Sequence, residues 1–141
     1  MNAETLVEPP PELDDFILAL LTQATEDVLA TTRPLVSFGL VESVSGQRSL
    51  KRILASTLEE SLNHARSAVT ADSLASRVGV AWDGYLTAEG ARTDAVYVEV
   101  SEHEADTSFV FAQRYARKGL LKKKTSLIGR PMLVANGNLF V

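Results

Sequence analysis

The sequence contains no cysteine and only two histidines among its 141 residues, which removes the side chains that most thiol and zinc chemistry requires. Without cysteine the chain forms no disulfide, no thiolate metal site and no cysteine nucleophile, and this composition is consistent with a reducing cytoplasm. No segment approaches the run of about 20 apolar residues that a membrane span needs. The acidic N-terminus also lacks the pattern of a signal peptide. We therefore expect a cytoplasmic protein that makes no membrane contact.

Acidic residues are absent from the C-terminal quarter of the chain. All eighteen Asp and Glu residues precede position 107, whereas seven of the fourteen Lys and Arg residues follow it. Residues 1–106 therefore carry a formal charge of −11 and residues 107–141 a charge of +7, which sum to the −4 of the chain. Such an asymmetry indicates either an anionic partner or a basic tail that folds back on an acidic body.

Two helices are predicted in the N-terminal half. Apolar residues recur at helical spacing from Leu13 to Leu29, after three consecutive prolines at 9–11, and Arg33-Pro34 marks the end of this helix. Residues 1–8 before it are expected to be frayed. A capping box, formed by Ser56 with Glu59 or by Thr57 with Glu60, predicts a second helix that runs to about residue 70.

The strand signals are concentrated in the second half. The stretch 77–118 reads as three antiparallel strands (77–87, 92–101 and 108–115), and the first two are joined by a glycine-containing turn at 88–91. Upstream, residues 35–43 predict a strand apolar enough for both of its faces to be covered. Residues 48–54 fit either a returning strand or the start of the second helix.

The chain is therefore predicted to be a single α+β domain spanning 1–141. We expect an antiparallel sheet of about five strands, with two helices on one face, and the pattern leaves the strand order unresolved. In the C-terminal segment, Ile128-Gly129-Arg130-Pro131 is predicted to form a turn. Asn136-Gly137 is predicted to form a hairpin bend before a last short strand at 139–141.

Two short signatures carry a resemblance. Thr93-Asp94-Ala95-Val96-Tyr97-Val98-Glu99 and Phe111-Ala112-Gln113-Arg114-Tyr115, followed by the turn at 128–131, resemble a set of short bacterial proteins of unknown function. That resemblance covers roughly residues 82–134 and implies a free-standing bacterial domain. If residues 48–54 form a strand, the element order is also similar to the profilin-like arrangement of roadblock and longin modules. That likeness implies a module that dimerises or binds partners and does no chemistry.

Catalytic patterns are sparse. Asp83, Asp94 and Glu99 lie on adjacent predicted strands, as in metal-dependent nucleases, but Glu99-Val100-Ser101 has serine where the restriction-endonuclease-like pattern requires lysine. Strand alternation also places Asp94 and Glu99 on opposite faces. The sequence has neither a Gly-x-Ser-x-Gly elbow nor a phosphate-binding loop. We assign no catalytic residue, no metal ligand and no cofactor, and an enzyme is the less favoured interpretation.

The strongest local anomaly is the basic segment 114–130. Its cationic side chains are interleaved with Tyr115 and two leucines, a pattern that can contact phosphates. Paired with the acidic turn 102–106, or simply solvated, the same residues would have no binding role. Arg114 lies within a strand, where it is expected to pair with Glu99 or Asp94. The candidate binding residues are Arg114, Tyr115, Arg117, Lys118, Lys122, Lys123 and Lys124.

Three functions remain as hypotheses. The first is a non-enzymatic module that self-associates, as a homodimer, and serves a bacterial protein partner, because the first helix and the aromatic strands offer more apolar surface than one thin sheet needs. The second is an anion or nucleic-acid binder that uses the basic segment, and the acidic charge of the whole chain disfavours it. The third is a metal-dependent hydrolase that uses the three carboxylates at 83, 94 and 99.

Overall fold

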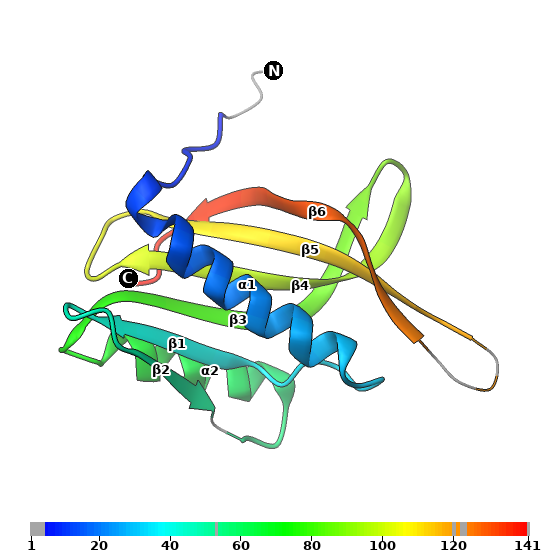
Figure 1. Ribbon diagram of the computed structural model, residues 1–141, viewed down its shortest axis with the longest axis horizontal. Coiled ribbons are helices and arrows are strands. Elements are labelled where there is room, and N and C mark those ends of the chain that lie inside the picture. The colour runs from blue at the N-terminus through cyan, green and yellow to red at the C-terminus, as the bar shows by residue number, and fades with distance from the viewer. Residues whose placement is uncertain (1–4, 53, 120, 122–123, 141) are drawn as a thin grey trace.

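The computed structural model describes residues 5–52, 54–119, 121 and 124–140, which form one antiparallel sheet between two helices (Figure 1). A short 3-10 turn (Pro11–Leu13) leads into the first helix. The elements that follow are α1 (Asp14–Leu29), β1 (Phe38–Ser43), β2 (Arg48–Arg52), α2 (Leu58–Thr70), β3 (Ala75–Ala88), β4 (Ala91–Glu102), β5 (Ser108–Lys118) and β6 (Lys124–Gly137). The α+β class is confirmed, with six strands rather than about five. Neither described helix is long and apolar enough to cross a membrane.

The sheet has the order β2-β1-β3-β4-β5-β6, and every neighbouring pair is antiparallel. The predicted meander is present as β3, β4 and β5. Residues 48–52 form the edge strand β2, which settles the alternative that the sequence left open. Its five residues are largely exposed and show no alternation of their own, so the pairing with β1 defines the strand.

The two helices lie on opposite faces of the sheet, so the expectation that both cover one face is wrong. Figure 1 shows α1 in front of the strands and α2 behind them. We call these sides the α1 face and the α2 face. Strand alternation explains the arrangement, because Phe38 and Leu40 of β1 pack with α1, whereas Val41 packs with α2. The apolar character of both faces of residues 35–43 was the sequence signal for this arrangement.

A glycine lies beneath each helix. A Cβ atom at Gly79 of β3 would come within 2.5 Å of the Leu20 side chain of α1, and one at Gly39 of β1 would overlap the Val69 side chain of α2. Both helices therefore approach the sheet more closely than any other residue at these two positions would allow. This close approach on both faces gives the central strands β1 and β3 a three-layer environment.

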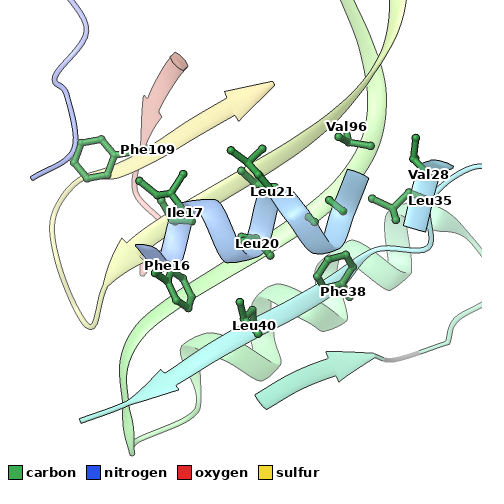
Figure 2. Packing of buried hydrophobic residues seen from close by; sticks show 14 of the residues in the cluster. Phe16, Ile17, Leu20, Leu21, Val28, Leu35, Phe38, Leu40, Val96 and Phe109 are labelled. Atoms are coloured by element: carbon green, nitrogen blue, oxygen red, sulfur yellow. The ribbon is translucent and has the colours of Figure 1, made fainter. Parts of the chain in front are cut away.

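The larger core belongs to the α1 face. Phe16, Leu20 and Val28 of α1 are almost fully buried against Phe38 of β1 and Val98 of β4 (Figure 2). They follow the helical spacing read from the sequence, and the predicted stripe from Leu13 to Leu29 is confirmed as far as Val28. Leu29 itself is exposed at the helix end.

The core beneath α2 is smaller. Ala65 and Val69 pack against Val78 and Val80 of β3, and Leu139, just after the last strand, completes the cluster. Of the two capping registers the sequence offered, α2 starts with Thr57 as its N-cap residue. The Thr57 hydroxyl accepts a hydrogen bond from the Glu60 backbone N–H at 3.0 Å.

Strand β6 corrects two sequence expectations. Ile128–Pro131 is not a turn and Asn136-Gly137 is not a hairpin, because both lie within one continuous strand of fourteen residues. The pairing of β6 with β5 shifts register twice, between Val110 and Phe111 and again between Ala112 and Arg114 of β5. The turn signal at 128–131 therefore lies in a bulge, whereas Asn136 and Gly137 pair regularly with Phe109 and Ser108 of β5. The expected final strand at 139–141 begins in a turn, and Val141 lies outside the described residues.

Gln113 of β5 holds the second bulge in place. Its side chain is 2% exposed, and its Nε2 donates to the backbone carbonyls of Ile128 and Gly129, both at 3.2 Å. Of the segments that carry the bacterial resemblance, the strand 111–115 and the segment 128–131 thus meet through a buried amide. This contact gives those two segments a structural role.

Candidate functional site

The basic segment does not form one surface. Along β5, Tyr115 lies opposite Asp94 and faces α1, whereas Arg114 lies opposite Ala95 and faces the other side of the sheet. Lys118 pairs with Lys124 at the far end of the β5–β6 hairpin, and both are exposed. Lys122 and Lys123 lie outside the described residues. The structure therefore divides the candidate binding residues between two faces and one strand end.

Arg117 is used internally. Its guanidinium donates to the backbone carbonyls of Thr31 at 3.3 Å and Arg33 at 2.7 Å, and to the Thr125 hydroxyl at 3.1 Å. These carbonyls lie just beyond the C-terminal end of α1, where backbone oxygens have no helical partner. Arg117 thus connects β5 to the segment that leaves α1.

Tyr115 and Asp83 form a partly buried polar contact on the α1 face. The tyrosine hydroxyl donates to both carboxylate oxygens of Asp83, at 2.8 and 2.9 Å, and the Leu35 backbone N–H donates to the same carboxylate at 2.8 Å. Burial, followed by the neighbouring Asp83 carboxylate, raises the pKa of the Tyr115 hydroxyl far above its ordinary value. This phenol keeps its proton at neutral pH, so it cannot serve as a base.

Arg114 does not make the cross-strand ion pair expected for it. Its Nε is buried and has no hydrogen-bond partner among the described residues. Glu99 instead pairs with Arg66 of α2 at 3.2 Å and accepts a hydrogen bond from the Ser108 hydroxyl at 2.5 Å. The carboxylate that the sequence assigned to Arg114 therefore joins α2 to the sheet.

The described bases of segment 114–130 do not pair with the acidic turn either. The turn at 102–106 lies at one end of β5, and Lys118 lies at the other end of this strand of eleven residues. Within the described part of the chain, the acids of the turn pair with their own neighbours. Glu102 contacts Arg77 at 3.3 Å, and Glu104 lies 3.6 Å from His103.

The three carboxylates of the hydrolase hypothesis do not converge. Asp83 and Asp94 face α1 on neighbouring strands, and Glu99 faces α2, as strand alternation predicts. Asp83 is also held by Tyr115 and Leu35. Among the described residues, no group of three or more His, Cys, Asp or Glu side chains is placed to hold a metal ion. This arrangement of acids is wrong for a metal-dependent hydrolase.

A polar cleft opens where the β3–β4 hairpin separates from β5. Two adjoining cavities of about 220 and 360 Å³ share Tyr85, Asp94, Tyr115 and Arg117 as lining residues. Tyr85 is covered by Arg92, whose guanidinium carbon lies 4.0 Å from the ring centroid. Two of the cleft's polar groups are already engaged, because Tyr115 holds β5 to Asp83 of β3 and Arg117 holds β5 to the segment after α1. The cleft is therefore mainly a structural junction.

A second depression has a different character. A groove of about 540 Å³ lies between the N-terminal segment, the first half of α1 and strands β5 and β6. We call it the α1–β6 groove. It is lined by apolar side chains, with two acids and two prolines: Ile17, Leu18, Leu21, Phe111, Leu133, Glu8, Asp14, Pro9 and Pro11. Its largest exposed apolar side chain, Leu18, is 63% exposed. An apolar lining with acids beside it is suited to a partner rather than to bond chemistry.

The wall of this groove is held by one side chain. The Asn136 amide of β6 accepts from the Val7 backbone N–H at 2.8 Å and donates to the Val7 carbonyl at 2.9 Å. The N-terminal segment, expected to be frayed over 1–8, is thus attached at residue 7, while residues 1–4 lie outside the described part. Sequence reasoning missed the groove. The available signal was Leu18, an apolar residue that lies off the buried stripe of α1.

Comparison with known proteins adds no relative. No family model matches the chain, and no curated protein or solved structure matches it significantly. The likeness to short bacterial proteins and to profilin-like modules stays a prediction. The functional argument therefore depends on the groove and on the residues around it.

Proposed function

We propose that this protein is a non-enzymatic interaction module that self-associates through the α1–β6 groove. The observation that carries the proposal is the groove itself, an open apolar depression with a lining of α1, β5 and β6 side chains. Exposed apolar surface of this kind is stabilised when a second protein surface removes it from water. The division of the carboxylates between the two faces of the sheet supports a binding role over metal-dependent hydrolysis.

The sheet edge beside the groove supports the same proposal. Strand β6 has a neighbour on only one side, β5, and its fourteen residues include the half-buried Met132, Leu133 and Val134. A long edge strand with apolar side chains is a surface that another chain can cover. The other edge strand, β2, is five residues long and carries three cations.

The test is the mass of the protein in solution across a concentration series, measured by sedimentation. We expect a concentration-dependent dimer. Leu18→Glu places a charge in the groove and should weaken the dimer by roughly thirtyfold or more, as expected for an anchor residue worth about 2 kcal/mol. Leu74→Glu is the matched control, because Leu74 is 79% exposed in the connection between α2 and β3, away from the groove lining. A wild-type protein that stays monomeric at every concentration would refute the proposal.

A further inference from the structure

We infer that the groove is occupied by the hairpin tip of a second copy of this chain, so that two copies exchange tips reciprocally. By hairpin tip we mean the described residues Lys118, Leu121 and Lys124 at the far end of the β5–β6 hairpin. The inference rests on the proposed function, because it names the partner that the groove takes.

The tip lacks a counter-charge of its own. Lys118 and Lys124 lie directly opposite each other in the β5–β6 pairing, and among the described residues neither forms an ion pair. Like charges at opposed strand positions are destabilising unless an anion lies nearby. Leu121, between them in the sequence, is fully exposed. The tip is therefore an apolar side chain flanked by two cations.

The groove has the complementary composition. Its floor is formed by Ile17, Leu21 and Phe111, and Glu8 and Asp14 contribute the carboxylates. Both acids are exposed, and neither forms an ion pair within the described part of the chain. A leucine on the apolar floor and lysines beside the two acids would satisfy both surfaces at once.

The positions of the two surfaces require a second copy. Leu133, which lines the groove, and Lys124, which belongs to the tip, are nine positions apart on β6, a separation of roughly 30 Å along a strand. Figure 1 shows the far ends of β5 and β6 extending away from the rest of the sheet, at the opposite end from the N-terminal segment. A chain therefore cannot place its own tip in its own groove.

A two-fold axis through the middle of the β6 edge solves this geometry. It reverses the second copy and brings each tip to the groove of the other, which gives a closed dimer with two identical contacts. The bulge at 128–131 and Pro131, which has no backbone N–H, interrupt hydrogen bonding in the middle of this edge. The side chains at the two ends, rather than a continuous ladder across β6, would then determine the association.

Charge reversal provides the test. The tip variant Lys118→Glu/Lys124→Glu and the groove variant Glu8→Lys/Asp14→Lys should each dimerise at least tenfold more weakly than wild type. Mixed in equal amounts they should form a heterodimer of near wild-type affinity, because both reciprocal contacts are then between opposite charges. Glu26→Lys/Glu59→Lys is the control for net charge, since both acids are exposed and neither lines the groove. Far-UV circular dichroism confirms that each variant is folded.

Several outcomes overturn the inference without touching the proposed function. A wild-type dimer that responds to Leu18→Glu but not to either reversed variant means that something other than the tip occupies the groove. A mixture that remains monomeric, or that assembles into open chains, contradicts reciprocal exchange. A tip variant that dimerises normally, but loses affinity for a labelled oligonucleotide that wild type binds, assigns the tip to nucleic acid instead. A monomeric wild type removes the proposed function as well.

Discussion

The two edges of the sheet meet solvent in different ways. β2 is short and its cations are neutralised, because each forms an ion pair with an acid of the body: Arg48 with Glu42, Lys51 with Asp72 and Arg52 with Asp27. β6 is nearly three times as long and is interrupted by two bulges, and its first residue, Lys124, has no ion pair among the described residues. One edge is thus short and lined by charged side chains that are already paired, and the other is closed to further strands only by irregular backbone.

The comparison explains the charge asymmetry of the sequence. Most of the Lys and Arg residues within 1–106 form ion pairs with acids of the same region. Other acids, such as Glu8 and Asp14, are left without ion-pair partners in the described part of the chain. In the basic quarter, Arg117 is used by backbone carbonyls, and the lysines at the strand ends remain free of ion pairs there. The excess negative charge and the excess positive charge are therefore not spread evenly over the protein. A partner would meet two small, separate charged surfaces.

The largest effect is expected where β6 is held to β5. Gln113→Leu keeps the volume of the side chain but removes the amide that donates to Ile128 and Gly129, leaving carbonyls without a donor. We expect a loss of about 3 kcal/mol in the free energy of unfolding, measured by urea denaturation. Gln47→Leu, at an exposed turn, should change it by no more than about 0.5 kcal/mol. Equal effects would mean that the buried amide does not hold the bulged edge.

The next effect concerns the acid that supports the β2 edge. Burial pushes the pKa of the Glu42 carboxyl up, but hydrogen bonds from Arg77 and Arg48 outweigh it and leave the pKa below its ordinary value of 4.5. The ionised form therefore stabilises the fold above that ordinary value, and the contribution is lost as the pH falls through the depressed pKa. Glu42→Gln should cost about 2 kcal/mol at neutral pH.

This difference between wild type and Glu42→Gln should shrink as the solution is acidified through the lowered pKa of Glu42, because the wild-type carboxyl then also becomes neutral. Urea denaturation at a series of pH values measures it. Glu26→Gln, at an exposed position of α1, is the control and should show little dependence. A gap between the two proteins that stays constant, or widens in acid, would contradict the assigned role of the carboxylate.

The smallest expected changes in stability come from replacing one lysine at each edge of the sheet. Lys51→Ser removes an exposed ion pair with Asp72 and should cost no more than about 0.5 kcal/mol. Lys124→Ser removes a like-charge neighbour of Lys118 and should stabilise the monomer by about 0.5 kcal/mol or less. Thermal denaturation of dilute protein at low and high salt measures both, and salt should reduce both differences. Destabilisation by Lys124→Ser would show that the tip has a counter-charge within its own chain.

Local patterns predicted the elements whose signal lies within a few residues. The stripe of α1 and the meander follow from helical or alternate spacing, and the structure confirms them. The capping box predicted the start of α2 but left Ser56 and Thr57 as alternative caps, and the structure selects Thr57. Residues 48–54 were ambiguous because their apolar residues fit one face of a strand and the stripe of a helix equally well, and only the pairing of 48–52 with β1 decides the conformation. The turn signals at 128–131 failed because Gln113, fifteen positions earlier, stabilises a bulge there instead.

The site was harder to predict than the fold for the same reason. The α1–β6 groove combines residues 8–11, 14–21, 111 and 133, so no window of the sequence contains it. The basic segment, by contrast, was visible at once, but strand alternation divides its side chains between two faces. A cluster along the sequence became a surface only at Lys118 and Lys124, where the two strands meet.

The only tryptophan provides a fluorescence signal for the packing of α2 on the sheet. Trp82 packs with the α2 core and stacks on Tyr97 with ring centroids 5.5 Å apart, and the Arg66 guanidinium of α2 lies 5.3 Å from its ring centroid. Its fluorescence therefore follows the departure of α2, whereas circular dichroism follows both helices. Because the strands β1 and β3 are shared by the two layers, the two signals should change at one urea concentration. Comparing tryptophan fluorescence with circular dichroism in the native protein therefore shows whether its layers unfold together.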